Sequence, residues 1–425
     1  AMNAHITGTL TDSVSSDTTT SNIRIQAKAN ADDKRITEVN ESSGTGNVSI
    51  TKKAGGEPVL FNARRYVGNQ LEREHSGYGF KPDLIWVKNR DNSISHMLVD
   101  SVRGLSGTGG GALLSNTNDS ADGIERITAF TSDGYQHYKS GNYTYTNTSD
   151  VAYVAWAWKA GGAPSADGKK IVDGTESNLT GATGVTNLRQ SVNSTGQFSI
   201  TKYRGNGAYG AVVPHGLTGT PDFLIIKRLS PADSWVVWHK NLSGSASGGV
   251  ISTSQTDFLQ LDDNDQEGYW NGSSATLAWA DQVTTTNIRL GNTAATNFTG
   301  ATNSSGNDFI MYAWKGTNVT GGANVSAFGT YTGTGGALSV TDCGFKPRWL
   351  MVKNIGGTQS WPIFDAFRES ATEKTTALWA DGSNADTTNS TYGITFTSTG
   401  FTMDSGTTSD QVNENNGTYI YMAFA

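Results

Sequence analysis

One strand pattern occurs three times along this chain of 425 residues: a proline, a run of apolar residues and then a lysine six residues after the proline. Internal repetition decides how the rest of a sequence is interpreted, because each copy is expected to form the same structural unit. The pattern therefore predicts an array of one β module, and such arrays more often hold or bind than catalyse. The copies are GFKPDLIWVK ending at Lys88, TGTPDFLIIK ending at Lys227 and GFKPRWLMVK ending at Lys353.

The copies also end alike, in strands rich in aromatic and small residues: VAYVAWAWK at 151–159, FIMYAWK at 309–315 and YIYMAF at 419–424. FTSDGY in the first copy matches FTSTGF in the third. The distance from the proline to the last aromatic residue is longest in the second copy. This difference predicts an insertion in that copy, around Leu261 to Trp279.

Alternation with a period of two, as in Val154, Trp156 and Trp158, is typical of strands. No stretch of 12 residues has a convincing helical period, so we expect an all-β chain. The fold class predicted is three tandem antiparallel β-sandwich modules of jelly-roll or lectin-like type. The predicted divisions are an N-terminal attachment segment or truncated repeat at 1–60, modules at 61–160, 196–316 and 325–425, and a linker or surface excursion at 161–195.

The composition of the chain argues against two classes of binding partner, nucleic acids and membranes. The net charge is −7 and no lysine or arginine cluster occurs, so nucleic acid is not an expected partner. No apolar run has the length of a membrane span, so membrane insertion is not expected. Cys343 is the single cysteine, which makes an intrachain disulfide impossible and leaves stability to packing or assembly.

The motifs GFKPDLIWVKNR, DSVRG, FTSDGY, YVAWAWKAGG and GTYIYMAFA resemble a family of bacteriophage virion proteins that is common in marine tailed phages. Members are described as tail-fibre-like or as a domain of unknown function, and the resemblance covers residues 60–425. It implies a virion location, a lectin-like sandwich and other virion proteins as partners. The family offers no established catalytic or binding residues.

A polar position recurs at the end of the strand that follows the lysine strand. It holds Asp100, His239 and Asp365, and an arginine follows each aspartate three residues later, at Arg103 and Arg368. The position is either a ligand site used in every copy or a carboxylate–guanidinium pair that closes a strand, with His239 as a repacked variant. Repetition in every copy favours the structural interpretation.

The strongest candidate ligand site lies in the second copy, where Asp262, Asp263 and Asp265 are followed by Tyr269 and Trp270. Aromatic rings beside carboxylates can hold sugars, and Asp263, Asp265 and Glu267 offer oxygen ligands for a possible calcium ion. The alternatives are a solvated acidic loop and aromatic residues that begin the next strand.

These observations predict a non-enzymatic structural or adhesive virion protein, in a tail fibre or surface appendage, that contacts a host surface glycan or receptor. It needs no cofactor other than the possible calcium, and we expect a homo-oligomer, with a trimer if the protein is a fibre. The alternatives are a capsid or tail decoration protein and, less favoured, a polysaccharide depolymerase.

Overall fold

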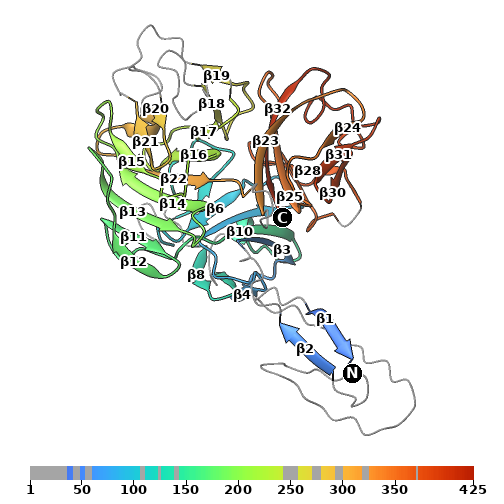
Figure 1. Cartoon of the computed structure of the whole chain (residues 1–425), viewed down its shortest axis with the longest axis horizontal. Coiled ribbons are helices and arrows are strands. Elements are labelled where there is room, and N and C mark those ends of the chain that lie inside the picture. The colour runs from blue at the N-terminus through green and yellow to red at the C-terminus, as the bar shows by residue number, and fades with distance from the viewer. Residues whose placement is uncertain are drawn as a thin grey trace. The chain divides into compact units, whose positions relative to one another are not determined.

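The computed structural model divides the chain into two compact units, Ala1–Val59 and Leu60–Ala425 (Figure 1). In the first unit, β1 (Ile36–Glu41) and β2 (Val48–Lys52) form an antiparallel pair. The structure describes residues 36–41, 48–52, 60–105, 111–122, 126–137, 143–242, 257–269, 279–291, 300–317, 325–369 and 372–425.

The second unit is built from mainly antiparallel sheets, and one five-strand order occurs in three of them. In each, the last strand of a copy lies between its first strand and its lysine strand, and two further strands follow the lysine strand. In copy 1 (61–160) these are β3 (Phe61–Val67), β10 (Ala152–Trp158), β5 (Leu84–Asn89), β6 (Met97–Asp100) and β7 (Leu113–Leu114). In copy 2 (196–316) they are β14 (Phe198–Arg204), β22 (Asp308–Trp314), β16 (Phe223–Arg228), β17 (Val236–His239) and β18 (Asp257–Gln260), with β19 (Gly268–Tyr269) beyond. In copy 3 (325–425) they are β23 (Ser326–Thr332), β32 (Thr418–Phe424), β25 (Trp349–Asn354), β26 (Pro362–Asp365) and β28 (Thr376–Trp379), with β29 (Thr387–Thr388) beyond.

Each copy adds a smaller antiparallel sheet. Ring contacts join the two layers: Tyr331 of β23 lies 5.7 Å from Phe401, which lies 5.5 Å from Tyr421 of β32. This is a sandwich-like arrangement. The smaller sheets are β4 (Arg73–Ser76), β9 (Gly134–His137) and β8 (Ile127–Thr131); β15 (Val212–Pro214), β21 (Asn287–Leu290) and β20 (Ala280–Val283); and β24 (Leu338–Val340), β31 (Gly400–Met403), β30 (Ile394–Thr397) and β27 (Glu373–Lys374). In the described residues the helical elements are short, η1 (Tyr143–Tyr145) and α1 (Gly300–Asn303), and none of them could span a membrane.

The segment 161–195, predicted as a linker or surface excursion, is not a linker but forms three strands. Three strands from this segment extend the large sheet of copy 2, and β13 pairs with β14 from Thr186 to Val192. The Ser, Thr, Gly and Asn content obscured a strand whose inward row includes polar Gln190 between Leu188 and Val192, all three of them buried. The added strands are β11 (Lys169–Val172), β12 (Thr175–Asn178) and β13 (Thr186–Val192), which form the green outer edge in Figure 1.

The repeated lysines join the three copies. Each is fully buried, and its ammonium group donates to a backbone carbonyl in a loop of another copy. Two residues after each lysine, a carbonyl accepts a backbone N–H from the same loop. The lysine bonds are Lys88 to Ser383 at 3.0 Å, Lys227 to Asn118 at 3.1 Å and Lys353 to Asn264 at 2.9 Å. The backbone bonds run from Asp386 to Arg90, from Ala121 to Leu229 and from Glu267 to Ile355.

These contacts close on themselves. Copy 1 reaches copy 3, copy 3 reaches copy 2 and copy 2 reaches copy 1, so every copy contributes one lysine and one accepting loop. A linear array would leave one lysine and one loop at its ends without a partner. The three copies are therefore arranged as a ring within a single chain.

The closing aromatic residues of the copies meet inside this ring. Trp158 lies 6.3 Å from Trp314 and 5.6 Å from Phe424, edge to face in both cases. All three side chains are buried, and one continuous core contains residues of every copy. Because buried aromatic side chains contribute the most to a core, the copies share their stability rather than folding as separate beads.

Replacing Lys227 with methionine tests the ring contact. The lysine ammonium also donates to the carbonyls of Arg228 and Asp233, so Lys227→Met fills a similar volume but leaves three carbonyls without this donor. We expect the free energy of unfolding to fall by about 2–4 kcal/mol, since each buried unsatisfied group costs about 1–3 kcal/mol and neighbours relax in part. Urea denaturation measures it. Lys240→Met, which breaks a partly exposed ion pair with Asp222, is the matched control and should change stability by under about 1 kcal/mol. Equal losses in the two variants would contradict the role given to Lys227.

Candidate functional site

The repeated aspartate–arginine pairs lie inside the protein. Arg103 Nε donates to Asp100 Oδ2 at 2.5 Å, and Arg368 Nε donates to Asp365 Oδ2 at 2.6 Å. The four side chains are at most 1% exposed. Such buried pairs leave no access for a ligand from solution, and their guanidinium groups also bond backbone carbonyls, for example those of Leu98 and Ile363.

The same carboxylates take part in the junctions between copies. Tyr312 Oη of copy 2 donates to Asp100 Oδ2 at 2.8 Å, and Trp156 Nε1 of copy 1 donates to Asp365 Oδ2 at 3.3 Å. At the third junction, Met422 occupies the position of Tyr312 and Trp156, and His239 occupies the position of the aspartates. Burial lowers the pKa of His239 to about 3, so the imidazole is neutral at neutral pH. Met422 has no proton to donate, and at this junction the position of the aspartate is held by the neutral His239.

The acidic loop of copy 2 is one of the three loops that accept a lysine. Asp262 Oδ1 accepts the Trp235 backbone N–H at 2.9 Å, as Asp381 accepts that of Trp361. The Asp263 carbonyl accepts Trp361 Nε1 of copy 3 at 3.2 Å. In all three loops the residue three positions after the lysine acceptor donates its backbone N–H to the other copy. The acceptors are Asn264, Asn118 and Ser383, and the donors are Glu267, Ala121 and Asp386. The insertion predicted around Leu261 to Trp279 therefore does not include Asp262–Glu267, since this segment has a counterpart of equal length in each copy. Residues 270–278 lie outside the described residues.

The calcium prediction gains no support. Among the described residues, no group of three or more His, Cys, Asp or Glu side chains is arranged to hold a metal ion, so the carboxylates of Asp263, Asp265 and Glu267 do not converge on one point. Tyr269 ends β19, and its side chain is not described. Trp270 lies outside the described residues. Sugar stacking on these two aromatic residues stays a prediction.

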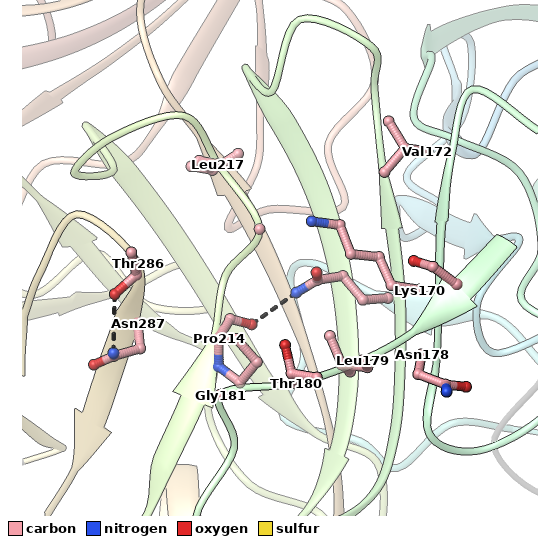
Figure 2. Close-up of a pocket in the computed structure, with 13 residues that line it drawn as sticks. Lys170, Val172, Asn178, Leu179, Thr180, Gly181, Pro214, Leu217, Thr286 and Asn287 are labelled. Carbon is pink, nitrogen blue, oxygen red and sulfur yellow. Dashed lines mark hydrogen bonds between the residues drawn. The ribbon is translucent and has the colours of Figure 1, made fainter. Parts of the chain in front are cut away.

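A cavity of about 560 Å³ lies elsewhere in copy 2, where the added strands face the smaller sheet (Figure 2). β11, β12 and β13 supply one side, and β15, the turn after it and the start of β21 supply the other. Its lining contains polar and apolar side chains but a single ionisable one, Lys170. The lining residues are Lys170, Val172, Ser177, Asn178, Leu179, Thr180, Gly181, Gln190, Pro214, Gly216, Leu217, Thr286 and Asn287.

Gln190 gives this cavity a fixed acceptor. Its Nε2 donates to the Pro214 carbonyl at 2.7 Å and to Thr201 Oγ1 at 3.0 Å. A carbonyl can only accept, so the amide nitrogen must face Pro214 and the orientation of the amide is settled. Gln190 Oε1 is buried and has no hydrogen-bond partner among the described residues. A Cβ on Gly216 would lie 2.6 Å from this oxygen, so only a glycine lets the turn pack this closely against Gln190.

His215 holds the turn that carries Gly216 and Leu217. Its Nδ1 accepts the Leu217 backbone N–H at 3.1 Å, so the proton lies on Nε2, which is 3.2 Å from the Thr284 carbonyl. Burial lowers the pKa of His215 to about 4, and the ring is neutral at neutral pH. This wall of the cavity is thus held by the side chains of His215 and Gln190, which bond backbone groups of the turn and of its neighbours.

No sequence motif singled out the cavity. Gln190 could have been noticed as a polar residue in the inward row of a strand, but only after the 161–195 segment is recognised as sheet.

A family model described as a domain of unknown function (DUF7483) matches residues 58–425. The chain belongs to this family. The matched region coincides with the second compact unit, so the DUF7483 domain contains all three copies together with the β11–β13 extension. Neither a curated protein nor a solved structure matches the chain.

A single substitution in a buried aspartate–arginine pair should lower the stability of the DUF7483 domain strongly. Asp365→Asn keeps the shape of the side chain but leaves Arg368 with Asp386 as its remaining charged partner. We expect unfolding free energy to fall by about 3–5 kcal/mol, because a buried guanidinium loses its closest counter-charge. Asp167→Asn, which breaks the exposed ion pair with Arg189, should change it by under about 1 kcal/mol. Thermal and urea unfolding of both variants measure this, and a small effect at Asp365 would show that the pair is not needed for the junction.

Proposed function

We propose that this chain is a non-enzymatic structural and adhesive component of a bacteriophage virion, in a tail fibre or surface appendage that contacts the host surface. The proposal includes the finer fold assignment, three lectin-like jelly-roll sandwiches, and other virion proteins as partners. The observation that carries it is the closed ring, in which the repeated lysines and aspartates serve contacts between copies. A closed ring of three copies would hold the surface that contacts the host in a fixed arrangement.

The motifs quoted above supply the phage context of this proposal. Within it, the β11–β13 extension with its cavity is a described part of the domain in which copy 2 differs from the other two copies. Shared features serve the frame in all three copies, so we place host contact at the feature that one copy alone carries.

A second candidate is a capsid or tail decoration protein whose contacts are purely structural. This candidate is favoured because the polar positions that recur in all three copies are buried. A decoration protein needs no ligand site at these positions. The two candidates differ in whether the isolated protein adheres to host cells.

Antibody labelling of intact phage particles tests the location. Gold particles should lie on the tail fibre or another external surface in electron micrographs, because the proposed role requires exposure. Particles without the gene product are the control. Label confined to infected-cell lysate, with particles unlabelled, would refute a virion role.

Fluorescently tagged full-length protein, incubated with host and non-host cells, separates the two candidates. Adhesion requires selective binding to host cells that competes with phage adsorption. Particle labelling without any binding to cells would identify decoration instead.

A further inference from the structure

We propose that acid opens the ring at both junctions of copy 3, because each of these junctions contains a buried histidine whose surroundings accept only the neutral ring. The two residues are His96 in copy 1 and His239 in copy 2, and both are 0% exposed. The contacts described between copies 1 and 2 include no histidine. This response to pH goes beyond the proposed virion role and does not depend on it.

His96 occupies a junction position that holds tryptophan in the other two copies, immediately before the strand that follows the lysine strand. In copy 2, Trp235 Nε1 donates to the Leu114 carbonyl of copy 1 at 3.0 Å. In copy 3, Trp361 Nε1 donates to the Gln260 carbonyl of copy 2 at 2.9 Å. An indole keeps its proton throughout the pH range in which an imidazole titrates. The histidine therefore makes the junction of copies 1 and 3 responsive to acid.

The surroundings of His96 exclude its protonated form. Trp86 Nε1 donates to His96 Nδ1 at 2.8 Å, and an indole N–H can only donate, so this ring nitrogen carries no proton. A proton added there would face the indole hydrogen and break the bond. The charged groups that act on the ring in the described structure are both cations, Lys88 of copy 1 and Arg368 of copy 3. Burial and these cations hold the pKa of His96 well below its ordinary value of 6.5.

His239 is the corresponding group at the junction of copies 2 and 3. The backbone N–H of Asn241 donates to His239 Nδ1 at 3.1 Å, so this nitrogen is also unprotonated. The backbone of Tyr421, in β32 of copy 3, is a hydrogen-bond partner of the ring. The charged group that acts on the ring in the described structure is Lys240, whose ammonium pairs with Asp222 at 3.0 Å. Protonation would thus add a second cation and oppose two N–H donors.

The direction of the response follows from these contacts. The closed ring favours the neutral form of both histidines, whereas in an opened ring each side chain regains water and its ordinary pKa of 6.5. Opening therefore takes up a proton at each site. The two junctions have their full stability above pH 6.5 and lose it as the pH falls toward about 3, the pKa of His239 in the closed ring.

Pyrene fluorescence across each junction tests the proposal on the full-length chain. Two exposed loop residues that flank a junction are replaced with cysteine and labelled with pyrene maleimide, and excimer emission reports that the two labels are close. The buried Cys343 is left in place. The label pairs are Asn92→Cys with Asn384→Cys for copies 1 and 3, Asn264→Cys with Thr358→Cys for copies 2 and 3, and Asn118→Cys with Ala232→Cys for copies 1 and 2.

We expect excimer emission to fall between about pH 6 and about pH 4 for both pairs that include copy 3, and to persist for the pair between copies 1 and 2. Far-UV circular dichroism should stay unchanged over this range, and return to neutral pH should restore the emission. These results would show that the junctions open before the strands unfold.

Asparagine variants identify the groups responsible, because an asparagine side chain can accept a hydrogen bond near the position of Nδ1 but does not titrate. His96→Asn should lower the midpoint for copies 1 and 3 by about one pH unit, and His239→Asn should do the same for copies 2 and 3. His215→Asn is the matched control, since His215 Nδ1 also accepts a backbone N–H but within copy 2. It should leave both midpoints within about 0.3 pH unit.

The inference is overturned if all three label pairs separate together with the circular dichroism signal, which is global acid unfolding. It is equally overturned if either pair that includes copy 3 stays closed down to about pH 3, or if His96→Asn and His239→Asn shift the midpoints no more than His215→Asn does. Should an asparagine variant fail to fold, the contrast among the three label pairs in the chain that keeps its histidines decides the question.

Discussion

The structure depends on three buried ammonium groups that bond backbone carbonyls across the junctions between copies. Placing an ammonium ion away from water is costly, and burial lowers the pKa of Lys227 to about 8 and that of Lys88 to about 7. The cost is offset only when the carbonyls of both copies converge on the nitrogen, as they do from Asn118, Arg228 and Asp233. The lysine therefore fixes how each lysine strand lies against the loop of another copy, and the meeting of Trp158, Trp314 and Phe424 follows from that placement.

Many strands of the three copies could be predicted from the sequence, because the side chains that mark them recur in each copy. The proline-to-lysine strand and the aromatic closing strand identify β5, β16, β25 and their partners, and the spacing of Asp100 and Arg103 indicates their pairing. Ring closure could not be predicted, since the acceptors are the backbone carbonyls of Ser383, Asn118 and Asn264 and no side chain marks them. The acidic loop is a related case: its carboxylates are what the sequence displays, while its backbone carbonyls make the contacts with copy 3.

The cavity could not be predicted for a different reason. Strands β11 to β13 carry many polar side chains, and in β13 the side chain of Gln190 points into the protein where an apolar residue is expected. A polar residue in an inward row is easily interpreted as loss of the strand pattern. In the folded chain the amide nitrogen of Gln190 donates to Pro214 and Thr201, while its oxygen is buried without a hydrogen-bond partner among the described residues. Such half-satisfied buried groups depend on tertiary contacts and have no local signature in the sequence.

Placing the three-membered ring in a single chain permits differences that identical subunits could not have. His239 and Met422 replace the charged junction at one of the three places, and the extension with its cavity belongs to copy 2 alone. In a ring of identical subunits each change would appear three times, and the junctions would have to tolerate all of them. Here all three copies make the lysine contacts at the junctions, while copy 2 has an extension of its own. Host contact through one such cavity would be weak by itself, and the predicted homo-oligomer would compensate by presenting several cavities to one surface, because linked sites bind far more tightly than single ones.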